Sequence, residues 1–203
     1  MPCRPTARPT AVATVLLLAL SLLAAGPAAA AAAADKPVAK ELKVAVEGEN
    51  VTINGKTLTL PADPADLVAV LGPPDRDVVL ANRILTWDAL GLVAYVTKKD
   101  PAKVRQLTVA LDRDPMKFWP TSTFSGTLTV DGAVVTARST VEEINKAKAG
   151  TKFAPDEVLT AWQSIAHENV LVMLTPPAAG ATPGANFSGL NVDARLAKAA
   201  AKK

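Results

Sequence analysis

Two short turn sequences constrain the fold of this chain most strongly. Asn54-Gly55 separates residues 51–53 from 57–60, and Asp131-Gly132 stands in the same position within 128–135. Around both turns apolar and polar residues alternate, which is the pattern of a strand with one buried face. Asn-Gly and Asp-Gly tolerate the positive φ angles of the tight turns that join antiparallel strands. The chain is therefore expected to contain two β-hairpins.

A helix start follows each hairpin. Asp63 precedes Pro64 and can accept the free N–H groups of a first helical turn. Thr140 and Glu143 have the spacing of a capping box, in which each side chain bonds the backbone of the other residue. Further strands are predicted at 42–46, 83–87, 92–96, 104–111, 170–175 and 187–192.

The matching order of these elements predicts an internal duplication. Asp63 matches Thr140, and Leu67 matches Ile144 in the same register. We therefore expect an α+β fold with two tandem ββαβββ-like halves and with helices packed on one side of antiparallel sheet. The halves are predicted at 42–115 and 124–193, with a junction at 116–123. The alternative is one irregular α+β domain without a repeat.

One segment, 156–166, is ambiguous. Val158, Leu159, Trp162 and Ile165 lie at helical spacing, which predicts an amphipathic helix. As a copy of 83–90, the same segment is predicted to be a strand, and we favour the strand.

The N-terminal residues 1–34 have the features of a secretory signal peptide. Basic residues precede an apolar run at 11–25, and an alanine tract follows up to Ala34. We expect cleavage after Ala34 and an exported protein, periplasmic or secreted. An uncleaved anchor is the alternative and the only membrane contact that is expected. Residues 35–41 are predicted to form a tether and 194–203 a frayed tail.

Composition excludes several classes of function. The single cysteine, Cys3, lies in the leader, and the single histidine, His167, is predicted in a turn. No disulfide framework and no Cys/His metal site is therefore expected, and no cofactor. The formal net charge of +3 includes Arg4 and Arg8 of the leader, so the remaining chain is close to neutral. Nucleic-acid binding is not expected at this charge.

Carboxylates flank an arginine at Asp75-Arg76-Asp77 and at Asp112-Arg113-Asp114. Pairs of carboxylates are the groups that hydrolyse glycosides. A cleft that unites Asp75, Asp77 and Asp88 is therefore the catalytic alternative. We favour solvated loops, because the central arginine neutralises its neighbours.

Tryptophans are the other candidates for binding. Trp87 and Trp162 occupy matching positions among apolar neighbours, which predicts two equivalent core residues rather than a stacking platform. Trp119 lies in the junction between Phe118 and Pro120, where it either seals the junction or marks a contact surface.

Three segments carry a family resemblance. Residues 71–76 read L-G-x-P-x-R, 87–91 read W-D-x-L-G, and 124–126 read F-x-G before a hairpin. Over 42–150 the chain resembles an uncharacterised bacterial family of a domain of unknown function. The resemblance implies a fold family and no activity. The charged motif residues Arg76 and Asp88 are expected to form a structural ion pair with each other, and contact with a ligand is the alternative. The candidate binding residues are Asp75, Arg76, Trp87, Asp88 and Trp119.

The function expected from these observations is that of an exported, non-catalytic binding module of the bacterial envelope or secreted fraction, with a protein partner. A carboxylate-dependent hydrolase that acts on an envelope or extracellular substrate is the alternative. A third hypothesis is an envelope assembly factor that oligomerises through sheet edges.

Overall fold

The computed structural model describes residues 41–99, 101–159 and 162–194. The predicted signal peptide, nearly all of the tether and the tail after Ala194 lie outside the described residues.

The smaller of two sheets has five strands in the order β3-β2-β1-β8-β9. All neighbours are antiparallel except β1 and β8, which run parallel. Both predicted hairpins are confirmed, because φ is positive at Asn54 and Gly55 (49° and 85°) and at Asp131 and Gly132 (44° and 85°). The strands are β1 (Lys43–Glu47), β2 (Asn50–Ile53), β3 (Lys56–Thr59), β8 (Thr127–Val130) and β9 (Ala133–Val134).

The larger sheet has eight strands in the order β10-β11-β12-β13-β7-β6-β5-β4, and all neighbours are antiparallel. At its centre, β13 pairs with β7 so that Asn191 lies opposite Thr108, with Leu190 opposite Val109 and Val192 opposite Leu107. The strands are β4 (Arg76–Val79), β5 (Arg83–Trp87), β6 (Leu92–Val96), β7 (Val104–Ala110), β10 (Ala154–Pro155), β11 (Gln163–Ala166), β12 (Val170–Thr175) and β13 (Gly189–Ala194).

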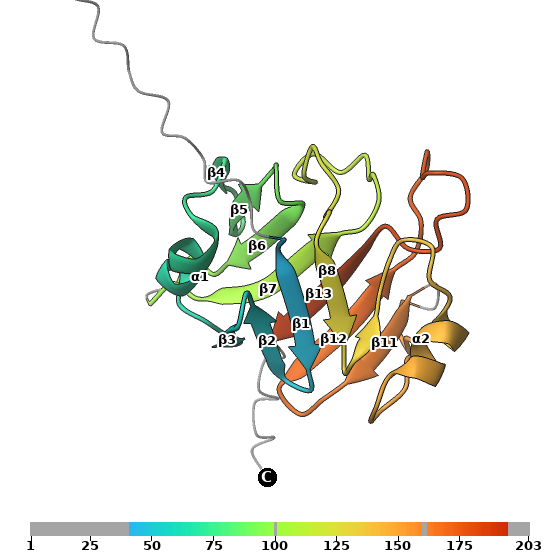
Figure 1. The fold of residues 1–203 in the computed structure, drawn as a ribbon. Helices are drawn as coiled ribbons and strands as arrows, with labels where there is room; N and C mark the ends of the chain where they lie inside the picture. Colours follow the sequence, from blue (N-terminus) through green and yellow to red (C-terminus); the bar gives the residue numbers. More distant parts are fainter. Residues whose placement is uncertain (1–40, 100, 160–161, 195–203) are drawn as a thin grey trace, which may run out of the picture. The chain divides into compact units, whose positions relative to one another are not determined.

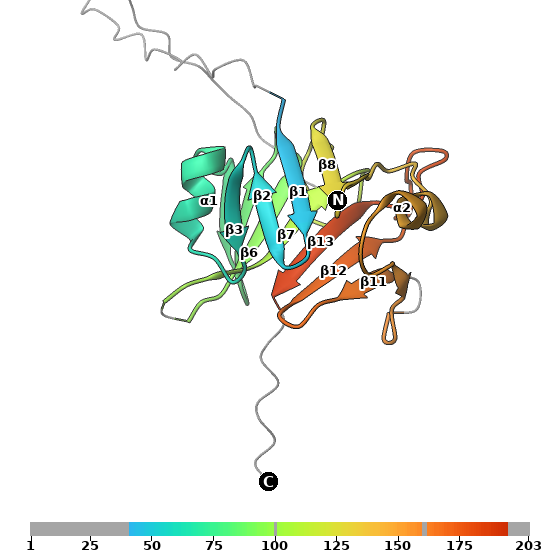
Figure 2. The ribbon, with the colours of Figure 1, turned by 60° about the horizontal axis from the view of Figure 1, so that its bottom comes forward.

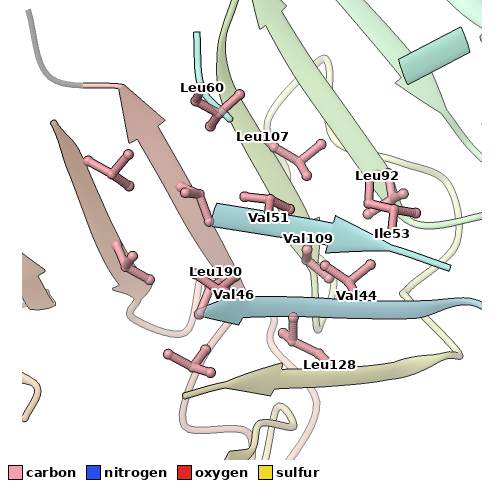
Figure 3. Close-up of a cluster of buried hydrophobic side chains, with 14 of the residues drawn as sticks. Val44, Val46, Val51, Ile53, Leu60, Leu92, Leu107, Val109, Leu128 and Leu190 are labelled. Atoms are coloured by element: carbon pink, nitrogen blue, oxygen red, sulfur yellow. The ribbon is translucent and has the colours of Figure 1, made fainter. Parts of the chain in front are cut away.

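The two sheets pack face to face, and the core lies between them (Figure 3). Alternate residues of each strand point into it, as a two-residue period requires. Each fully buried aliphatic side chain contributes roughly 1.5–3 kcal/mol. The small sheet supplies Val44, Val46, Val51, Ile53 and Leu128, and the large sheet supplies Leu92, Leu107, Val109 and Leu190.

The α+β prediction is wrong, because the protein is mostly β. The described residues contain two helices, α1 (Pro64–Leu71) and α2 (Val141–Ala147), which lie at opposite sides of the sandwich (Figures 1 and 2). Each helix links an edge strand of the small sheet to an edge strand of the large sheet. The physical reason is that each helix fully buries one residue, Leu67 or Ile144, which is too little apolar surface to cover a sheet face. The second sheet covers that face instead.

The predicted helix starts are confirmed. The Asp63 side chain accepts the backbone N–H of Ala65, and Thr140 and Glu143 form the expected capping box. The predicted strand at 156–166 is confirmed only for β11.

Candidate functional site

Charged and aromatic motif residues meet at the β4–β5 end of the large sheet. Arg76 in β4 binds Asp88 through two hydrogen bonds, from Nε to Oδ2 at 2.7 Å and from Nη2 to Oδ1 at 2.8 Å. The predicted ion pair is therefore present. These bonds hold the pKa of Asp88 below its ordinary value, and the backbone N–H of Thr121 contributes in the same direction. Asp75 lies beside the pair and accepts the backbone N–H of Ala89 at 3.4 Å.

Arg76 also fixes the connection between β7 and β8, which we call the strap (residues 112–123). Its Nη2 donates to the Trp119 carbonyl at 2.8 Å and its Nη1 to the Lys117 carbonyl at 3.3 Å. The Trp119 indole N–H donates to the Asp112 carbonyl at 2.9 Å. The ring lies against Gly189 of β13, where an added Cβ would come within 2.8 Å of it. Trp119 thus takes the sealing position, which was one of its two predicted roles.

Trp87 is separated from this cluster because its side chain points to the other side of the sheet. It is 1% exposed in the core, and its indole N–H donates to the Gly72 carbonyl at 2.9 Å. The structure therefore brings together Asp75, Arg76, Asp88 and Trp119 but not Trp87. Trp162 is only half-buried, so the prediction of two equivalent core tryptophans is wrong.

Of the three carboxylates proposed for hydrolysis, Asp75 and Asp88 lie near each other, but Asp77 does not join them. Asp77 follows Arg76 in β4, and consecutive strand residues point to opposite faces. Asp77 binds Arg83 through two hydrogen bonds of 2.9 and 2.7 Å, which lower the pKa of Asp77. Asp112 accepts two hydrogen bonds from Thr182, at 2.7 and 2.6 Å. Although burial works to raise the pKa of Asp112, these bonds outweigh it and lower the value.

Polar side chains gather on the outer face of the large sheet, which is the face opposite the core. Thr108 and Asn191 are buried there and share a 2.5 Å hydrogen bond between Oγ1 and Oδ1. The amide of Gln106 donates to both, and the Asn191 amide donates to Thr175 at 2.8 Å. This network was not predicted, because polar residues in alternating strands are typical of any solvated sheet face.

A small hollow of about 170 Å³ lies beside this network. Its lining includes Arg105, which an irregular register between β6 and β7 leaves without a strand partner. Arg105 lies 3.5 Å from the Asp193 carboxylate. Burial raises the pKa of Asp193, and the charge of Arg105 works against that rise. The residues that line the hollow are Asn82, Tyr95, Val96, Thr97, Arg105, Gln106 and Asp193.

A much larger groove, of about 1240 Å³, lies at the opposite end of the large sheet, away from Arg76 and Asp88. Its floor includes Leu171 and Met173 of β12, and the turn at 156–159 forms part of its wall. Val158 and Leu159 of that turn are 85% and 45% exposed. The sequence prediction missed this groove because it placed both residues in a regular element with a buried face.

Within the described ranges, no cluster of three or more histidine, cysteine, aspartate or glutamate side chains has an arrangement that would hold a metal ion. None of the helices in those ranges has the length and apolar character needed to span a bilayer.

Comparison with known families identifies the class of this domain. Residues 43–145 match a family described as a domain of unknown function. This family is DUF7738, and because the match covers half of the chain, the protein belongs to it. Neither the curated proteins nor the solved structures yield a match to the chain. The matched range contains Arg76, Asp88 and the strap but ends within α2, so the large groove lies outside it.

Proposed function

We propose that this protein is an exported, non-catalytic binding module of the bacterial envelope or secreted fraction, and that it binds another protein. The observation that carries the proposal is the outer face of the large sheet. Neither α1 nor α2 packs on this face, because Leu67 and Ile144 both point into the core between the sheets. The polar centre at Thr108 and Asn191 is buried, and the Trp119 ring of the strap lies beside it against Gly189, so the open parts of the face are the two hollows. Surfaces of this composition, partly apolar and partly polar, are typical of protein interfaces.

The paired carboxylates support binding over hydrolysis. A general acid needs a raised pKa, whereas the pKa values of Asp77 and Asp88 are lowered. Both side chains are bound to arginines, which fits a structural role in the sheet and the strap.

The leader supports export. The basic start, apolar run and alanine tract of 1–34 match the pattern of a signal peptide, and no cysteine follows Cys3. The L-G-x-P-x-R, W-D-x-L-G and F-x-G segments lie within 43–145 and are the features by which we assign the family to bacteria.

We also propose that the sandwich arose by duplication of one hairpin–helix–four-strand unit. The order β2-β3-α1-β4-β5-β6-β7 is followed by β8-β9-α2-β10-β11-β12-β13. Thr108 and Asn191 stand at matching positions of the two copies and pair directly with each other, and this pairing and the matching turns at Asn54-Gly55 and Asp131-Gly132 support this origin. The outer face would then consist of two equivalent four-stranded surfaces that meet at the polar centre.

Affinity capture tests the proposed function. The full chain, tagged at its C-terminus, is expressed in the bacterium that makes it, and retained proteins are identified by mass spectrometry. We expect one protein to be enriched by the wild type and lost from a Gln106→Arg, Leu171→Arg variant of the outer face. The matched control is Thr52→Arg with Thr57→Arg on the outer side of the small sheet.

Two results would contradict the proposal. One is the absence of any specifically retained protein. The other is turnover of a polysaccharide or ester by the wild type that is lost in a folded Asp88→Asn variant.

A further inference from the structure

We propose that the large groove at β10–β12 binds a basic segment of the partner protein that also carries apolar side chains. This inference rests on the proposed function and names the chemistry of the partner at one part of the outer face.

The size of the groove indicates a chain segment rather than a small molecule. Pockets for small molecules measure roughly 300–1,000 Å³, and this groove measures about 1240 Å³. It combines the β12 side chains Leu171 and Met173 with the turn at 156–159, so its surface is contributed by strands and a loop together.

The apolar part of the groove is held in an exposed position by its own turn. The Asp156 carboxylate accepts the backbone N–H groups of Val158 and Leu159 at 2.9 and 2.8 Å. This Asx-type turn fixes the backbone while the Val158 side chain stays 85% exposed. Contiguous exposed apolar side chains mark interaction sites. Since Leu171 and Met173 are half-buried in the same groove, the apolar surface continues from the turn onto the sheet.

The charges of the groove select a basic occupant. Asp156, Glu157 and Glu168 are among its lining residues, against one basic residue, Lys152. Asp156 is engaged in the turn, so Glu157 and Glu168, both exposed, remain to face a partner. Lysine or arginine side chains of the partner would complement these carboxylates, which favours association with that partner over acidic ones.

The edge strand beside the groove does not favour pairing with an added strand. β10 has two residues, and one of them, Pro155, has no backbone N–H to donate. We therefore expect side-chain contacts in the groove, rather than extension of the sheet, to hold the segment.

Fluorescence anisotropy with labelled peptides tests the chemistry directly on the full chain. The probe alternates lysine and leucine, and two peptides of equal length serve as controls, one of glutamate and leucine and one of lysine and serine. We expect the lysine–leucine peptide to bind, with an affinity that falls as salt is added. Each control peptide is expected to bind at least about tenfold more weakly. Equal binding of either control peptide would overturn the proposal.

Variants locate the binding. Glu157→Lys with Glu168→Lys is expected to weaken binding of the lysine–leucine peptide about tenfold or more. Val158→Ser, which removes the exposed apolar side chain without adding charge, is also expected to weaken it. The matched control reverses two exposed carboxylates elsewhere, Glu47→Lys with Glu142→Lys, and is expected to bind as the wild type. Unchanged binding in both groove variants would overturn the proposal.

A variant truncated after Ala194 distinguishes two possible occupants of the groove, a partner protein and the basic residues 195–203 of the chain itself. If the peptide binds only after this truncation, the tail is the occupant and the partner proposal is overturned.

The capture experiment distinguishes failure of the groove assignment from failure of the proposed function. If the groove variant still retains the wild-type partner, the proposed function stands and the groove assignment fails. If the wild type retains nothing, the proposed function fails as well.

Discussion

The two ends of the large sheet differ in whether their polar and apolar side chains are engaged in contacts within the protein. At the β4–β5 end, Arg76 and Asp88 bind each other and the strap, and the Trp119 ring lies against Gly189. At the β10–β12 end, Val158 stays exposed above a groove whose lining includes three acidic residues and one basic residue. The comparison teaches that a high density of charged and aromatic motif residues does not mark the open surface of this protein. The motif end is closed by its own contacts, and the end without motifs presents the open surface.

The strongest test of this contrast compares the two tryptophans. Trp87→Ala removes a fully buried ring and is expected to destabilise the fold by about 4 kcal/mol. Trp162→Ala removes a half-buried ring and is expected to cost about 1 kcal/mol. Urea unfolding followed by circular dichroism measures both values. Equal losses would show that Trp162 is packed as firmly at the β11 end as Trp87 is beside β5.

A smaller effect is expected for the ion pair of the closed end. Asp88→Ala leaves the partly buried Arg76 without its carboxylate and removes an acceptor for the strap, which is expected to cost about 2 kcal/mol. Asp77→Ala breaks the ion pair between Asp77 and Arg83, which is more exposed, and is expected to lower the free energy of unfolding by less than about 1 kcal/mol. The same unfolding assay applies, and a larger loss for Asp77→Ala would show that the strap is not held by Arg76 and Asp88.

The pH dependence of stability offers a further test. Because the folded-state pKa of Asp88 lies below its unfolded value of about 3.9, the ion pair stabilises the fold above that pH. This contribution is lost as the pH falls through the folded-state pKa. We expect the difference in unfolding free energy between the wild type and Asp88→Asn to be largest at pH 7 and to shrink below about pH 4. A difference that is constant down to about pH 2 would rule out this linkage.

The smallest effect is expected at the open end. Val158→Ser changes an exposed side chain and is expected to alter stability by less than about 0.5 kcal/mol. Thermal unfolding measures this change. A loss of more than about 1 kcal/mol would mean that Val158 packs within the fold and does not belong to a free surface.

The local elements were predictable because their signals are chemical and short in range. Asn54 and Asp131 adopt the positive φ angles that the turns require, and Asp63 and Thr140 cap the helices as expected. The fold class was not predictable, because alternation indicates a buried face without indicating what covers it. Strand β4 was missed since Arg76–Val79 begins with two charged residues and reads as a loop.

The candidate site was predictable in part for the same reason. Arg76 and Asp88 belong to compact motifs, so their pairing followed from the sequence. The groove depends on the exposure of Val158 and Leu159, which results from the turn at Asp156. Helical spacing of apolar residues predicted the opposite, a buried stripe.

The position of β13 has a consequence for how the chain folds. This strand is the last one that the structure describes, yet it lies in the middle of the large sheet, between β12 and β7. In the small sheet, β1 similarly pairs with β8, more than 80 residues later. Neither sheet can be completed from one half of the sequence, and such distant pairings slow folding. We therefore expect the sandwich to assemble after synthesis has passed Ala194, as a single late event rather than half by half.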